Sequence, residues 1–199
     1  RIALGPVTAG MIAGVEQAAV VNDIPTGGAN WTRWIEIEGH PPADPKVPMT
    51  ADWREISRDY FSTMRIPVRA GRAFTRADRD DTARVAVVSE SMARKFWPGE
   101  DPLGRKVRAK DGKWLTVVGV CGDVIHDWFD RRNAPTLYVP FEQEPNGELA
   151  FVVRTSGDPA AASGPVRQAL LTIDPKQPVF DLMTMRTAIK ERTIGLQYL

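Results

Sequence analysis

The stretch SESMARKFWPGEDPLGRKV, residues 89–107, decides the fold because it sets a helix between a buried strand and a fixed exit of the chain. The hydroxyl of Ser89 is placed to accept a free backbone N–H at the start of this helix. Met92 and Phe96 share one helical face at a spacing of four residues, and Pro98 ends the helix. The stretch contains no obvious catalytic nucleophile, metal-ligand set or phosphate loop, so its organisation indicates a structural part.

Strands and short helices alternate around this stretch. Thr32–Gly39 alternates side chains with a period of two, with Trp34, Glu36 and Glu38 on one face, which is typical of a strand. Gly104–Val124 predicts two strands around a hairpin turn at Asp111-Gly112. The other predicted elements are a short helix over Arg58–Ile66 and strands over Val15–Val21, Met49–Ser57, Arg84–Glu90, Thr136–Glu142 and Leu149–Ser156.

The C-terminal part combines a strand, a helix and a second strand. An apolar stripe at i, i+3, i+4 and i+7 from Val166 to Ile173 predicts an amphipathic helix after Asp158-Pro159. Gly164-Pro165 is expected to kink that helix or to delay its start. We predict a strand over Gln177–Met185 and a last helix capped by Thr184. Residues 149–185 would then form one β-α-β unit, which favours an α+β fold with mixed sheets faced by short helices.

Composition limits the function classes. The 199 residues are 43% hydrophobic and 26% charged, which suits a folded body of one or two domains. The formal net charge is only +1, so the chain lacks the basic footprint of a nucleic-acid-binding protein. The mixed-sign run Thr75–Arg84 is expected to be a solvated turn.

The N-terminal stretch Arg1–Val15 carries no charge after its first residue. It is too short to cross a membrane, so we expect no transmembrane helix within the chain. A short helix is predicted over residues 2–13, and the absence of an initial methionine suggests an excised fragment or mature form. A membrane span could flank the chain on either side.

Few side chains suggest catalysis or metal binding. Asp123, His126 and Asp127 follow a buried strand, and an Asp-His pair can orient an imidazole as a general base, but spacing identifies no nucleophile. Asp78, Asp80 and Asp81 lack the alternating spacing and the glycine of a calcium loop.

Other features also point away from an enzyme. The single cysteine, Cys121, lies in an apolar run and is expected to be a structural thiol. No P-loop or dinucleotide fingerprint is present in the sequence. We therefore expect no cofactor, no metal and no catalytic residues, and a protein that works by contact, relay or passive binding.

Five ordered motifs carry a resemblance to a known family. The chain resembles the extracytoplasmic domains of MacB-type ABC permeases of the FtsX/MacB-like superfamily, in particular orphan permeases with two such domains per chain. The resemblance covers about residues 14–192. The motifs are SRDYFSTMRIPVRAGRAFTRAD (57–78), VAVVSESMARKFWPGEDPLGRKV (85–107), WLTVVGVCGDVIHD (114–127), PTLYVPFEQ (135–143) and FVVRTSGDPAAASGPVRQALLTIDPKQPVFDLMTM (151–185).

This resemblance implies both an architecture and a role. It implies a porter-like β-α-β lobe made of residues 1–75 and 148–199, with an inserted strand-rich lobe over residues 76–147. The domain would lie on the periplasmic side of the inner membrane, between the first two transmembrane helices of a permease half. It would be non-catalytic and would relay motion powered by a cytoplasmic ATPase subunit. Its other expected partners are a second permease domain and an envelope protein.

The chain departs from the family pattern at three places. Ser89 stands where the pattern has Asn, which preserves an acceptor for the helix cap. Ser163-Gly164-Pro165 interrupts an alanine-rich helix start. Trp128 and Phe129 lie in a loop, where they are a candidate partner contact or else pack over the sheet.

Two other functions stay open from the sequence. One is a free-standing periplasmic binding or interaction module with a similar fold, which the gene sequence around this segment would distinguish from a permease domain. The other is an enzyme that uses Asp123, His126 and Asp127, which an alanine substitution of His126 would test.

Overall fold

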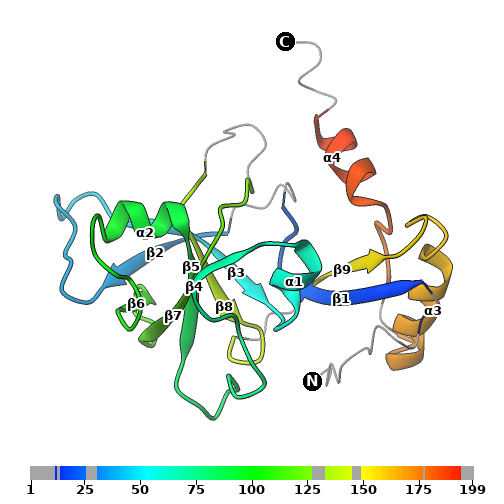
Figure 1. Ribbon diagram of the computed structural model, residues 1–199, viewed down its shortest axis with the longest axis horizontal. Coiled ribbons are helices and arrows are strands. Elements are labelled where there is room, and N and C mark those ends of the chain that lie inside the picture. Colours follow the sequence, from blue (N-terminus) through cyan, green and yellow to red (C-terminus); the bar gives the residue numbers. More distant parts are fainter. Residues whose placement is uncertain are drawn as a thin grey trace. The chain divides into compact units, whose positions relative to one another are not determined.

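The computed structural model of the chain describes residues 12, 14–25, 31–126, 133–144, 149–176 and 178–193. Over these residues the protein is a sheet-rich α+β fold with a few short helices, as predicted (Figure 1). In chain order the elements are β1 (Val15–Val21), β2 (Thr32–Ile37), β3 (Thr50–Ile56), α1 (Tyr60–Met64), β4 (Val68–Gly71), β5 (Val85–Ser89), α2 (Glu90–Phe96), β6 (Lys106–Ala109), β7 (Leu115–Cys121), β8 (Thr136–Pro140), β9 (Ala150–Thr155), α3 (Ser163–Ile173) and α4 (Met185–Thr193).

The chain divides into two compact units. The central unit comprises Ala19–Val152, and the terminal unit combines the chain up to Ala18 with the chain from Val153 onward. The boundaries fall inside β1 and β9. The lobe boundaries predicted near residues 75 and 147 divide the chain differently, into a porter-like lobe and an inserted lobe. That division rests on the family resemblance and stays a prediction.

The strand pairings of the central unit close on themselves. The order β2-β6-β7-β5-β8-β3 returns to β2, because β2 pairs with both β6 and β3. The β3–β8 and β5–β7 pairs are parallel, and the other pairs in this ring are antiparallel. A sheet closed in this way has no free edge among these six strands, which leaves them little freedom to slide past one another.

One hydrophobic cluster draws side chains from all six strands of the closed sheet. Met92 and Trp97, at the two ends of α2, belong to the same cluster and are almost fully buried. The strand members are Ile35, Ile37, Ala51, Trp53, Ala86, Val88, Val107, Leu115, Val117, Val120, Leu137 and Val139. A second buried group packs the aromatic rings of α1 against Phe74 and Tyr138. The central strands are therefore covered on both faces, which explains their long apolar runs.

Helix α2 forms where the sequence predicted it. The Ser89 hydroxyl accepts a hydrogen bond from the Met92 backbone N–H at 3.2 Å, and it also accepts one from the Thr136 backbone N–H at 3.0 Å. The cap thus ties the helix start to strand β8 as well. Gly99 and Gly104 both adopt positive φ angles, of 77° and 78°, where the chain turns away from the helix.

Strand β4 was not predicted as a strand, because the sequence around Gly71 reads as a crossing loop. It pairs with β7 antiparallel, with a bulge between Val68 and Ala70. Gly71, at φ 67°, faces Gly119, and a Cβ on Gly71 would lie 2.3 Å from the Val118 carbonyl oxygen. The two glycines allow the strands to approach at a distance that larger residues would prevent.

The terminal unit corrects one prediction. Residues 178–184 form no strand, so the expected β-α-β unit lacks its second strand. Asp181 has a φ of +52°, which breaks an extended run, and the Val179 carbonyl accepts a hydrogen bond from Arg167 of α3 at 2.8 Å. The Thr184 hydroxyl accepts a hydrogen bond from the Thr187 N–H at 3.1 Å and caps α4, as predicted.

Helix α3 starts at Ser163, so the break at Gly164-Pro165 delays the helix and does not kink it. Pro165 falls in the first turn, where a missing N–H costs no helical hydrogen bond. Asp158 caps only the preceding turn, through a bond from the Ala160 N–H at 3.0 Å. The helix predicted over residues 2–13 lies outside the described residues.

Candidate functional site

A groove lies between the β2–β3 loop and the tip of the β6–β7 hairpin, within the central unit. Its volume is about 640 Å³. Trp34 and Trp114 both line it, and their side chains are 53% and 37% exposed. The full lining is Trp34, Ile35, Glu36, Ile37, Glu38, Gly39, His40, Pro41, Pro42, Pro45, Lys46, Pro48, Met49, Lys110 and Trp114. We call this feature the Trp34–Trp114 groove.

The strands beside the groove carry charged side chains in register. Glu36 is opposite Arg108 in the β2–β6 pair, and Arg108 donates to its carboxylate at 2.7 Å. Glu38 pairs with Lys106 at 3.4 Å. The guanidinium of Arg108 also lies 4.4 Å from the centre of the Trp114 ring. These contacts hold the groove wall in one arrangement.

The groove was not predicted from the sequence. One signal was present, because the period-two pattern of the first alternating strand put Trp34 on the same face as two glutamates. A single exposed aromatic residue is common on protein surfaces, so this signal alone does not indicate a site. The groove also needs Lys110 and Trp114, more than seventy residues further along the chain, which only the fold brings beside Trp34.

A buried polar network lies on the other side of β3. Arg54 is 1% exposed, and its Nε donates to His126 Nδ1 at 3.3 Å. Its Nη2 lies 3.8 Å from the Asp23 carboxylate. His126 Nε2 lies 3.2 Å from the Tyr138 hydroxyl. A buried arginine needs such partners because an unpaired charge in the protein interior is costly.

His126 is buried, with 4% of its surface exposed. Burial, with the Arg54 charge as a second cause, lowers its pKa from the ordinary value of 6.5 to about 3. Since Nδ1 accepts from Arg54, the neutral ring carries its proton on Nε2 and donates it to Tyr138. The imidazole therefore acts as a structural acceptor and donor within the network.

Two of the three residues of the enzyme hypothesis, Asp123 and His126, are held by different partners. Asp123 Oδ1 accepts from the Ser91 backbone N–H at 2.7 Å, and Oδ2 accepts from Arg94 at 2.7 Å. Burial raises the Asp123 pKa, but these hydrogen bonds outweigh burial and hold it below the usual range. Asp123 thus anchors the start of α2, while His126 joins the network around Arg54. Asp127 lies outside the described residues.

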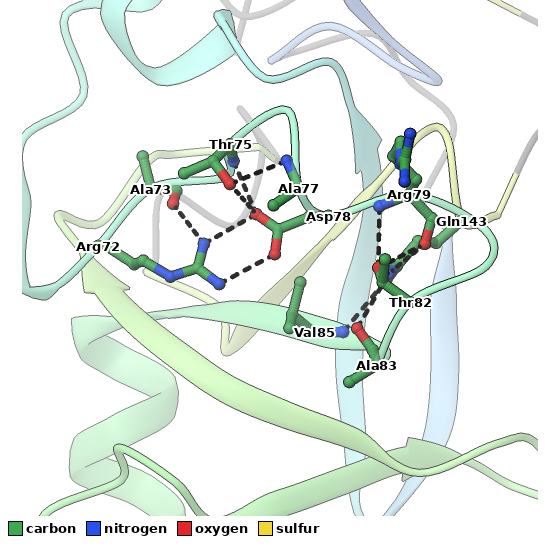
Figure 2. Close-up of polar contacts among 10 residues, drawn as sticks. All are labelled: Arg72, Ala73, Thr75, Ala77, Asp78, Arg79, Thr82, Ala83, Val85 and Gln143. Carbon is green, nitrogen blue, oxygen red and sulfur yellow. Dashed lines mark hydrogen bonds and ion pairs between the residues drawn. The ribbon is translucent and has the colours of Figure 1, made fainter.

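The run Thr75–Arg84 is mostly exposed, as predicted for a solvated turn, but Asp78 within it is buried and fastens the loop. Arg72 holds Asp78 through two hydrogen bonds, at 2.8 and 2.9 Å, and the Thr75 N–H donates to the same carboxylate at 2.7 Å (Figure 2). Burial raises the Asp78 pKa, but the bonds from Arg72 and Thr75 outweigh it and keep the pKa low. Asp78 is 5% exposed.

Gln143, which follows β8, fastens the far end of the same loop. Its amide nitrogen donates to the Arg79 carbonyl at 2.9 Å and to the Ala83 carbonyl at 3.1 Å. Its oxygen accepts from the Val85 N–H at 3.1 Å (Figure 2). One buried amide thus ties the loop to the start of β5. Within the described part of the chain, no group of three or more His, Cys, Asp or Glu side chains is placed to hold a metal ion.

The remaining predicted positions divide between the core and the undescribed residues. Cys121 is fully buried, and burial raises the pKa of its thiol to about 12, so the thiol is structural as expected. Trp128 and Phe129, the candidate partner contact, lie outside the described residues. Among the helices that the structure describes, none combines the length and the apolar character needed to span a bilayer.

Comparison with known proteins identifies the fold and the family. The sheet-rich α+β architecture is shared with solved periplasmic and extracellular domains of transporters. The chain belongs to the MacB-like periplasmic core domain family, whose model matches residues 8–169. The resemblance seen in the sequence is therefore confirmed: this is a periplasmic or extracellular domain of a MacB-like permease.

Three solved structures share the fold at low sequence identity. The periplasmic region of MacB from Actinobacillus actinomycetemcomitans has a TM-score of 0.62 at 19% identity, and the match covers 94% of this chain and 78% of that one. The extracellular domain of the noncanonic ABC-type transporter YknZ from Gram-positive bacteria has a TM-score of 0.62 at 18% identity, with 88% and 85% covered. A domain of a putative permease from Porphyromonas gingivalis has a TM-score of 0.54 at 18% identity, with 89% and 83% covered. No curated protein sequence matches the chain.

Proposed function

We propose that this domain is a non-catalytic mechanical part of an ABC-type permease. It relays motion that a cytoplasmic ATPase subunit powers and contacts a substrate or partner protein in export or another envelope process. The match of residues 8–169 to the MacB-like periplasmic core domain family carries the proposal. In this proposal the permease is in the inner membrane, and its transmembrane helices connect the domain to the ATPase.

The packing of the central unit supports a relay. A part that transmits motion must move as one body, and closely packed interiors resist gradual deformation. Six strands close on themselves around one hydrophobic cluster, and α2 is tied to both β8 and Asp123. The network around Arg54 joins β3 to the chain after β7. These contacts favour rigid-body movement of the central unit.

The partners of the proposed relay are a second permease domain and an envelope protein. Trp128 and Phe129 stay candidates for one of these contacts, since aromatic side chains are enriched at the centres of protein interfaces. Alanine substitution of both residues in the full-length permease, followed by crosslinking to envelope proteins, would test this. An unchanged crosslinking pattern would remove them as candidates.

Spin labels can test the relay in the full-length permease, reconstituted with its ATPase in lipid vesicles. Ser62 and Lys95 are exposed positions on α1 and α2, and each can be replaced by cysteine, while the native Cys121 is buried and will not react. We expect the distance between labels at 62 and 95 in one domain to stay constant between the nucleotide-free and ATP-trapped states. A single label at 95 on each of two paired domains should report a changed distance between the domains.

The opposite pattern would contradict the proposal. If the permease hydrolyses ATP at full rate while the label at 95 keeps the same distance between paired domains, the domain relays no motion. If the distance between 62 and 95 changes within one domain, the central unit deforms and does not act as a rigid part.

A further inference from the structure

We propose that the Trp34–Trp114 groove binds a small amphiphile with an apolar, preferably aromatic, body and one anionic group. This inference does not rest on the proposed relay, because it concerns a binding site that a transporter domain or a free-standing module could use. It rests on the size of the groove, its aromatic walls and the balance of charges along it.

The size of the groove fits one small molecule. Pockets for small ligands enclose about 300–1,000 Å³, and this groove encloses about 640 Å³. A stable protein partner would instead need to cover about 800 Å² on each side, which is far more than the walls of this groove provide. The geometry therefore favours a small ligand over a folded partner.

The aromatic walls favour an apolar body that contains a ring. Trp34 is 53% exposed although it is the largest side chain on β2, and four prolines of the β2–β3 loop also line the groove. Lys110 Nζ lies 4.8 Å from the centre of the Trp34 ring, over one face. About half of the Trp34 side chain is exposed and it lines the groove, so the ring offers an aromatic surface to a ligand.

The charges of the groove favour an anionic group. Its two carboxylates are already paired, Glu36 with Arg108 and Glu38 with Lys106. The ammonium groups of Lys46 and Lys110 have no carboxylate within ion-pair distance among the described residues. His40, at the rim, is paired with Glu100 at 3.6 Å. Two unpaired cations beside an apolar surface attract a carboxylate, phosphate or sulfonate.

The wall of the groove is preorganised for binding. Ile35, Glu36 and Ile37 pair directly with residues 107–109 of β6, and the β6–β7 pairing continues the same sheet. Side chains on paired strands keep their positions better than those on free loops, so little order has to be gained on binding.

Two fluorescent probes that differ in one group test the proposal on the 199-residue chain. 8-Anilinonaphthalene-1-sulfonate has an aromatic body and a sulfonate, and N-phenyl-1-naphthylamine has the same rings without the charge. We expect the sulfonate probe to bind with one site per chain, and about fivefold more tightly than the neutral probe. Added salt should weaken the sulfonate probe only.

Substitutions locate the site. Lys110→Gln and Lys46→Gln should each weaken binding of the sulfonate probe about three- to fivefold and leave binding of the neutral probe unchanged. Trp34→Ala should weaken both probes about tenfold. Lys113→Gln is the matched control, because Lys113 is exposed on the same hairpin but does not line the groove. Circular dichroism confirms that each exposed substitution leaves the fold intact.

Each contrary result is decisive. Equal affinity for the two probes, or equal losses in Lys110→Gln and Lys113→Gln, would show that the groove does not select an anionic group. Full binding of both probes by Trp34→Ala would place the site elsewhere. Lack of binding by both probes would show that the groove is not a ligand site.

Discussion

Acidification should destabilise the central unit through one side chain, His126. Protonation of its Nδ1 would place an N–H where Arg54 now donates, at 3.3 Å, and would set two positive charges side by side in the interior. The fold therefore keeps the ring neutral, and its pKa falls from 6.5 to about 3. The unfolded chain binds this proton below about pH 6.5, whereas the folded chain does not.

The sign and size of the effect follow from this difference. A depressed histidine pKa leaves stability intact above pH 6.5 and removes it progressively as the pH falls from 6.5 toward 3. Integrating the difference in proton binding between the unfolded and folded chain, from about pH 7.5 to about pH 5.0, lowers the free energy of unfolding by about 2 kcal/mol. At a typical slope for urea unfolding, this lowers the midpoint by about 1 M.

Urea unfolding followed by tryptophan fluorescence measures this loss. All six tryptophans lie between residues 31 and 128, so the signal reports on the central unit. His126→Asn supplies an oxygen that can accept from Arg54 and does not titrate, so it should lose much less stability between the two pH values. His40→Asn removes the other histidine, keeps the buried network and should still lose about 2 kcal/mol.

The wild-type chain and His126→Asn are the decisive pair. Equal losses of stability in the two proteins between about pH 7.5 and about pH 5.0 would refute the argument, whatever their absolute stabilities. The window also excludes Asp78 and Asp123, because carboxylates with lowered pKa values change protonation only at lower pH.

Three further predictions concern packing and one ion pair in the central unit, with Gly99→Ala as the control for the first. Gly71→Ala should cost about 2–4 kcal/mol, because the methyl group meets the Val118 carbonyl and φ is positive. Gly99→Ala shares the positive φ but has no atom within 4 Å of the added carbon, so chemical denaturation should show only about 1–2 kcal/mol lost; equal costs would rule out the clash. Trp97→Ala should cost about 3–5 kcal/mol, measured by circular dichroism, because it empties a buried site in the main cluster; a loss under about 1 kcal/mol would contradict that packing. Asp78→Asn should cost about 1–2 kcal/mol near pH 7, because it removes the charged hydrogen bonds from Arg72. The difference in unfolding free energy from wild type should shrink as the pH falls below 3.8, since Asp78 is then protonated. A difference that stays constant down to acidic pH would exclude the ion pair as its cause.

Local features of the fold could be predicted from the sequence. The Ser89 cap, the α2 face and the Asp111-Gly112 hairpin depend on residues a few positions apart, and all three are present in the structure. The prediction of a strand over residues 177–185 was wrong. A strand-like residue pattern cannot show that Asp181 turns the chain or that Thr184 caps a helix.

The closed sheet and the site features could not be predicted in the same way. Arg54 reads as an outward charge on an alternating strand, but it is buried because α1 and the chain after β7 cover that face. The groove depends on Trp34 and Trp114, which approach only when β2 and β6 pair. Such pairings between distant segments leave no local signal in one sequence.

The parallel pairing of β3 with β8 also sets the order in which the domain can mature. Asp52 lies beside Thr136, so the last seam of the sheet joins residues more than eighty positions apart. A chain that crosses a membrane from its N-terminus would expose β3 well before β8 arrives to cover it. Folding would then wait for the end of translocation, and a protecting chaperone would be most useful during that interval.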